Sequence, residues 1–158
     1  MKSKYFLLVC IAVLTAFSSC KKEPEYDAQK QLEADEVKIK EFIATNNIPA
    51  VRHSSGLYYQ ILTPGTGDLV YTANTAISAN YTLRLLNGET IPQPAGPLDF
   101  ILGGNIIDGW KIGIPLIQKG GKIRLIVPSV YAYGPQPRNG IPVNSILDFD
   151  IELVNATN

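Results

Sequence analysis

Apolar and polar side chains alternate along three stretches in the second half of the chain. These stretches cover residues 77–85, 122–127 and 147–153, and a period of two sends successive side chains to opposite faces of a β-strand. The pattern predicts three antiparallel strands with one buried and one solvated face. Tyr81 occupies an apolar position and is expected to point inward. Further strand candidates are residues 57–62 and 98–102.

Charged side chains on the solvated faces of these strands are complementary in sign. The last stretch carries acids and the other two carry bases: Asp148, Asp150 and Glu152 against Lys122, Arg124 and Arg84. If these strands are neighbours in the sheet, their opposite charges form favourable cross-strand pairs. Because the carboxylates project into solvent, we expect them to favour solubility rather than general acid–base catalysis.

Two other segments have the features of helices. Between residues 27 and 46, apolar side chains recur at helical spacing among lysines and glutamates, and Asn46-Asn47 before Pro49 ends the pattern. The apolar stripe of this helix either dimerises or packs on the adjacent domain, and we favour packing. Residues 110–117 form a short apolar run that Asn105 or Asp108 can cap, so we predict a buried helix across the sheet. The fold class is therefore α+β.

The first twenty residues have the features of an export signal. Lys2 and Lys4 precede an apolar run of about a dozen residues, shorter than the ~20 that a bilayer-spanning helix needs. The run ends in Phe17-Ser18-Ser19-Cys20, which resembles a bacterial lipobox. We predict lipid on Cys20 and attachment to the outer membrane, facing the periplasm or the cell surface; the alternative is an ordinary signal peptide cut near Ser19.

The chain of 158 residues is long enough for one compact domain. We expect a signal peptide over residues 1–19, a charged tether over 20–27, a helical extension and linker over 28–55, and the globular domain over 56–158. Cys10 and Cys20 are the only cysteines in the sequence. A mature chain that begins at Cys20 therefore has no disulfide within its domain.

Composition excludes several classes of function. Without Lys2 and Lys4 the chain has 12 basic against 14 acidic side chains, a balance that does not attract nucleic acid. His53 is the only histidine, so we expect no metal cluster and no cofactor. Gly65-Thr66-Gly67 is interpreted as a turn, because no helix pattern or phosphate-binding lysine follows it.

A long loop over residues 128–145 joins two predicted strands and contains Tyr131-Ala132-Tyr133-Gly134-Pro135. Loops of this length in compact domains tend to be functional. Together with inward-pointing Tyr81 and the single tryptophan, Trp110, the loop predicts an apolar, aromatic binding pocket with a few hydroxyl donors.

Four motifs in the second half of the chain resemble the FKBP family of peptidyl-prolyl cis-trans isomerases in order and spacing. They are Gly109-Trp110; the stretch from Gly120 to Tyr133-Gly134 with Lys122, Leu125 and Pro128; Gly140-Ile141-Pro142; and Leu147-Asp148-Phe149-Asp150-Ile151-Glu152-Leu153. The resemblance runs from about Gly56 to Val154. It implies an FKBP-like fold, in which a twisted antiparallel sheet half wraps a short helix and leaves a hydrophobic cavity between them.

The resemblance also implies which residues form the site. Trp110 is the expected floor of the cavity and acts with Tyr81 and Tyr133. The expected walls are Leu98, Phe100, Ile106, Ile107, Ile141 and Phe149. In the family, the N–H matching Ile107 and the hydroxyl matching Tyr133 hydrogen-bond the ligand's carbonyl groups. The alternative is that these aromatic side chains only fill the core.

The implied activity is isomerisation of X-Pro bonds in exported proteins, with proline-containing segments as partners and the chain as a monomer or weak dimer. Two alternatives remain open, a noncatalytic chaperone or peptide-binding lipoprotein and a lipoprotein that binds a small apolar molecule. Many active members carry an aromatic residue and an aspartate where this chain has Ile91 and Pro92. Asp99 does not substitute, because strand alternation sends it outward. We therefore expect reduced catalytic efficiency with peptide binding retained.

Overall fold

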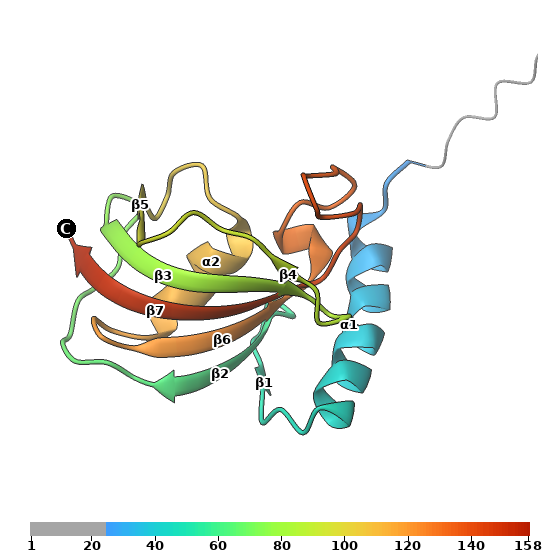
Figure 1. Cartoon of the computed structure of the whole chain (residues 1–158), viewed down its shortest axis with the longest axis horizontal. Helices are drawn as coiled ribbons and strands as arrows, with labels where there is room; N and C mark the ends of the chain where they lie inside the picture. The colour runs from blue at the N-terminus through green and yellow to red at the C-terminus, as the bar shows by residue number, and fades with distance from the viewer. Residues whose placement is uncertain (1–24) are drawn as a thin grey trace, which may run out of the picture.

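The computed structural model describes residues 25–158 as one antiparallel sheet with a helix against one face and a second helix at one end (Figure 1). The signal segment and Cys20 lie outside the described residues. The strands are β1 (Val51–Arg52), β2 (Tyr58–Thr63), β3 (Ala76–Leu85), β4 (Thr90–Ile91), β5 (Leu98–Ile101), β6 (Lys122–Val127) and β7 (Leu147–Thr157). The helices are α1 (Ala28–Thr45), α2 (Asp108–Gly113) and two short 3₁₀ turns, η1 (Ile114–Leu116) and η2 (Ser129–Tyr131). The predicted α+β class is confirmed.

The strands follow the order β1-β2-β6-β7-β3-β4, and β5 pairs with the start of β3. The three alternating stretches predicted from the sequence become β3, β6 and β7, which lie side by side (Figure 1). Their apolar side chains form the main core, in which Leu125, Phe149 and Leu153 are almost fully buried. Strand alternation therefore decided which side chains face this core.

The complementary charges of these strands pair as predicted. Lys122 Nζ lies 3.4 Å from a Glu152 carboxylate oxygen, and Arg84 Nη2 lies 2.6 Å from Asp150 Oδ2. Asp148 accepts hydrogen bonds from Arg84 Nε at 3.2 Å and from Arg124 Nε at 2.8 Å.

The expectation that Asp148 projects into solvent is wrong, because only 1% of its surface is exposed. The two arginines cover its carboxylate, and the Phe42 ring of α1 lies 6.0 Å from the Arg124 guanidinium. Strand alternation does not reveal that Arg84 and Arg124 enclose this group.

α2 occupies the position expected for the short buried helix and lies close against β6. A Cβ atom at Gly109 would collide with Val127, and one at Gly113 would collide with Leu125. The glycines therefore allow the helix to approach the sheet closely. The predicted helix ends early, at Gly113, and continues as η1, because Pro115 has no N–H to donate to the preceding turn.

Asp27 caps the start of α1, because its side chain accepts a hydrogen bond from Lys30 N at 3.0 Å. Its apolar stripe packs on its own domain. Ile39 is fully buried in a second cluster with Tyr58 and Ile126. The favoured packing prediction is confirmed by this burial. Over residues 25–158, no helix combines the length and the apolar content needed to cross a membrane.

Candidate functional site

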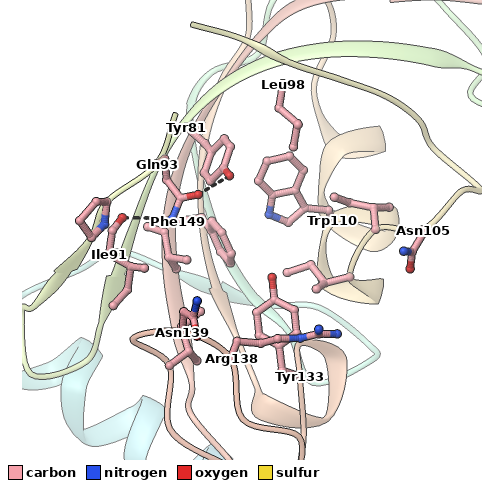
Figure 2. A pocket seen from close by; sticks show the side chains of 15 residues that line it. Tyr81, Ile91, Gln93, Leu98, Asn105, Trp110, Tyr133, Arg138, Asn139 and Phe149 are labelled. Atoms are coloured by element: carbon pink, nitrogen blue, oxygen red, sulfur yellow. Dashed lines mark hydrogen bonds between the residues drawn. The ribbon is translucent and has the colours of Figure 1, made fainter. Parts of the chain in front are cut away.

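A cavity of ≈ 510 Å³ opens between α2, the inner face of the sheet and the loop over residues 128–145 (Figure 2). Its volume falls in the range of small-ligand sites. The side chains around it are Tyr81, Leu83, Ile91, Pro92, Gln93, Leu98, Asn105, Ile106, Ile107, Trp110, Tyr133, Arg138, Asn139, Ile141 and Phe149. The fold thus brings together eight of the nine pocket residues expected from the sequence.

Trp110 lies deep in this cavity with 2% of its surface exposed. The Tyr81 ring stands edge-on to the indole, with centroids 4.9 Å apart, and the Phe149 ring does the same at 5.5 Å. Edge-to-face contacts of this kind favour one fixed arrangement of rings. Within residues 25–158 the buried indole N–H has no hydrogen-bond acceptor.

Phe100 was expected in the cavity wall and does not line it. β5 pairs with β3 so that Leu98 lies opposite Ala79 and Phe100 opposite Ile77. Phe100 therefore lies two residues farther from Tyr81 along β3 than Leu98 does. Its ring packs on the indole, with centroids 5.5 Å apart, and supports Trp110 without facing the cavity.

The Tyr81 hydroxyl donates a hydrogen bond to Gln93 Oε1 at 2.6 Å, and Gln93 Nε2 donates to the Ile91 carbonyl at 3.1 Å (Figure 2). Burial raises the pKa of Tyr81, and the nearby Tyr133 raises it further. The phenol therefore stays protonated and acts as a donor.

The sequence did not predict a role for Gln93, which follows Ile91 and Pro92. Its only local signal is an amide side chain beside two prolines in an otherwise apolar segment. Nothing in this spacing shows that the side chain turns back to meet Tyr81.

Tyr133 lies on the opposite side of the cavity, in the loop that follows β6. The loop is more regular than expected: it contains η2, and Arg138 and Ile141 form an isolated bridge. The Arg138 guanidinium carbon lies 5.1 Å from the centroid of the Tyr133 ring, within cation–π range. Arg138 and Asn139 were not predicted as pocket residues, because the fold of the loop places them there.

Ile107 precedes the first turn of α2 and has extended backbone angles. Its carbonyl accepts a hydrogen bond from Trp110 N at 3.0 Å, and none of the hydrogen bonds formed within residues 25–158 uses its own N–H. Ile107 also lines the cavity.

Among the described side chains that line the cavity, Arg138 is the only charged one. Within residues 25–158, no cluster of histidine, cysteine and acidic side chains has the arrangement of a metal site. The cavity thus combines apolar walls, hydroxyl and amide donors and one cation. This chemistry suits binding of an uncharged or partly acidic peptide segment.

Residues 69–154 match the FKBP-type peptidyl-prolyl cis-trans isomerase family along more than half of the chain. The chain belongs to the FKBP family. An FKBP-type peptidyl-prolyl cis-trans isomerase FkpA from Buchnera aphidicola subsp. Schizaphis graminum is 42% identical over 108 residues, which are 66% of this chain and 42% of that protein. The chain spans about two fifths of the length of the curated relatives that it matches.

Solved structures agree with this assignment. The crystal structure of FkpA from Escherichia coli has a TM-score of 0.69 and 34% identity, over 82% of this chain and 62% of that one. A peptidyl-prolyl cis-trans isomerase from Pseudomonas syringae pv. tomato has a TM-score of 0.66 and 29% identity, over 86% of this chain and all of that one. The predicted FKBP-like fold is confirmed.

The structure also locates the departure of this FKBP chain from many family members. Ile91 and Pro92, which replace the aromatic residue and the aspartate, both line the cavity. The side chain that accepts the hydrogen bond from the Tyr81 hydroxyl is Gln93, one residue beyond Pro92. A neutral amide oxygen therefore provides the acceptor on this side of the cavity.

Proposed function

We propose that the protein is a peptidyl-prolyl cis-trans isomerase that binds proline-containing segments of exported proteins in the cavity around Trp110. The observation that carries the proposal is the edge-on packing of Tyr81 and Phe149 around the indole, which builds a fixed apolar seat for a pyrrolidine ring. Membership of the FKBP family supports the same reaction.

The reaction requires no nucleophile, metal or cofactor. The barrier to rotation about a peptide bond, about 18–20 kcal/mol, comes from amide resonance. Resonance separates charge between oxygen and nitrogen, and water stabilises the planar form more than the twisted one. A cavity that removes this water and fits the twisted bond lowers the barrier.

The proposed roles follow from the positions of the side chains. Trp110 seats the proline ring, Tyr81 closes one side, and the Tyr133 hydroxyl and Ile107 N–H hold carbonyl groups that flank the bond. The remaining proposed contacts are Leu98, Ile106, Ile141 and Phe149, with Phe100 supporting the indole from behind. These assignments use the placement of each side chain around the cavity.

Exchange spectroscopy by NMR on an Ala-Leu-Pro peptide tests the activity. We expect the wild-type chain to accelerate cis–trans exchange, and Trp110→Leu to lose both acceleration and peptide binding. Tyr133→Phe is compared with Tyr71→Phe, which removes a hydroxyl that donates to the Ile117 carbonyl at 2.8 Å outside the cavity. Tyr133→Phe should raise KM, whereas Tyr71→Phe should leave it unchanged.

A noncatalytic peptide-binding protein is the second candidate, because no described side chain that lines the cavity is acidic. Wild-type protein that binds the peptide at high concentration without accelerating its exchange would establish this alternative. An apolar metabolite that copurifies, together with no peptide binding, would instead favour a small-molecule carrier.

We also propose that lipid on Cys20 holds the domain at the outer membrane through the tether over residues 20–27. The apolar run after Lys2 and Lys4 and the Ser18-Ser19-Cys20 sequence support this proposal. Labelling cells with a radioactive fatty acid tests it: the wild-type chain should take up label and fractionate with membranes, whereas Cys20→Ser should do neither. Sedimentation of the delipidated chain tests the expected monomer or weak dimer.

A further inference from the structure

The carboxylate of Asp35, in the middle of α1, is completely buried. In the sequence it lies far from the residues that line the cavity. Asp35 has 0% of its surface exposed. Its Oδ2 accepts hydrogen bonds from Ser129 N at 2.7 Å and from Ser129 Oγ at 2.6 Å, while Oδ1 accepts one from Gln31 Nε2 at 2.8 Å. A buried carboxylate is stable only with donors of this kind, and bonds to a charged acceptor are among the strongest.

Ser129 is the first residue of η2 and is itself fully buried. Its carbonyl accepts hydrogen bonds from Ala132 N at 3.0 Å and from Gly134 N at 2.8 Å. These two residues flank Tyr133. Asp35 therefore binds Ser129, and Ser129 in turn stabilises the turn that contains Tyr133.

Two further contacts join the N-terminal segment to the same turn. The Tyr131 hydroxyl donates to the Ser55 carbonyl at 2.8 Å. The Tyr26 hydroxyl lies at the surface of Gly134, 3.5 Å from where a Cβ atom would stand. The segment over residues 26–55 thus contacts the turn at three successive places, of which only the Asp35 contact is buried on both sides.

We propose that Asp35 is a positioning residue for the site: through Ser129 it sets the place of the Tyr133 hydroxyl relative to Trp110. α1 is then part of the isomerase unit rather than a separate helical extension. This inference rests on the proposed function, because Tyr133 is the group through which it acts on turnover. Small displacements of a positioned group are costly to catalysis even when the rest of the fold is intact.

The chemistry of the contact predicts graded effects. Asp35→Ala leaves two buried donors of Ser129 without an acceptor, so the turn must move to reach water. Asp35→Asn keeps one oxygen that can accept from both donors of Ser129. Its amide nitrogen then faces Gln31, whose own amide must flip so that its oxygen accepts from it. Ser129→Ala removes the hydroxyl bond and keeps the bond from the backbone N–H.

The variants are made in the full chain and compared at a temperature at which urea unfolding shows each to be folded. Asp35→Ala should lower kcat/KM on the Ala-Leu-Pro peptide about tenfold, mainly through KM. Hydrogen exchange should increase at residues 130–136 and stay unchanged in β6 and β7. Asp35→Asn should retain most of the wild-type kcat/KM. The matched control is Glu36→Ala, the next residue of α1, which pairs with Arg52 and Lys40 away from this turn.

Folded Asp35→Ala with wild-type kcat/KM and unchanged exchange at residues 130–136 would overturn the proposal. An equal loss in Glu36→Ala would also overturn it, because general destabilisation would then explain both. If Asp35→Ala does not fold, Ser129→Ala replaces it and should raise KM several-fold. If the wild-type chain binds peptide without isomerising it, the proposed function fails, and the positioning role is judged by peptide affinity, read from Trp110 fluorescence, and by exchange.

Discussion

The hydrogen bond between Tyr81 and Gln93 is the sharpest test of how this FKBP pocket works without the usual acid. Gln93→Leu removes the acceptor that lies 2.6 Å from the Tyr81 hydroxyl. Gln93→Glu puts a carboxylate back on the same side of the cavity. The two variants change the acceptor in opposite directions, so they separate its effect from that of side-chain size.

The expected change in kcat/KM follows from the strength of the hydrogen bond between Tyr81 and Gln93. A neutral hydrogen bond contributes about 1 kcal/mol net, which corresponds to roughly fivefold in an equilibrium or rate constant. The half-buried phenol in Gln93→Leu can turn toward water, so we expect a loss of about threefold to fivefold in kcat/KM. A bond to a carboxylate is about twice as strong, but Gln93→Glu also loses the bond from Nε2 to the Ile91 carbonyl, so its rate should stay close to that of the wild type.

NMR exchange on a Leu-Pro peptide gives kcat/KM, and quenching of Trp110 fluorescence gives the peptide affinity. A double-mutant cycle with Tyr81→Phe shows whether Gln93 acts through the phenol. In that background Gln93→Leu should have almost no further effect. Unchanged rates in both Gln93 variants, or fully additive losses in the cycle, would refute the reasoning.

Three further predictions concern charge and stability. Because Arg138 is the cation at the cavity, Glu before proline should be preferred over Lys several-fold at low salt; the ratio of kcat/KM should approach one in Arg138→Gln, and an unchanged ratio would contradict this. Asp148→Asn should lower the free energy of unfolding by about 3 kcal/mol in urea titrations, whereas Asp150→Asn, whose side chain is 44% exposed, should cost less than about 1 kcal/mol; equal losses would show that burial is not the cause. Because burial raises the pKa of Tyr81 above its ordinary value of 10.0, the unfolded chain loses this proton first. The free energy of unfolding should therefore decrease as the pH rises above about 10, where the unfolded chain ionises first. The decrease should be smaller in Tyr81→Phe, which has no phenol proton to lose at this position.

The strands of the sheet could be predicted because their signal is local. In β3 the odd positions from Ile77 to Leu85 are apolar, and a strand has only two faces, so the pattern itself orients the side chains. The same logic indicated that bases and acids on the outward faces are complementary, and Lys122 and Glu152 form one such pair in the structure. β1 and β4 were not predicted, since two residues are too few to show a period. The burial of Asp148 was not predicted, because it depends on how Arg84 and Arg124 close over its carboxylate in the folded sheet.

The pocket divides in the same way. The sequence alone showed a resemblance to the FKBP family, which implied an FKBP-like domain and the expectation that Trp110, Tyr81 and Tyr133 surround one cavity, where the structure places them. Only the tertiary structure decided that Gln93 receives the Tyr81 hydroxyl, that Phe100 stands behind the indole, and that Asp35 holds Ser129 across 94 residues of chain. Such contacts join segments that the backbone brings together after folding, and no local period records them.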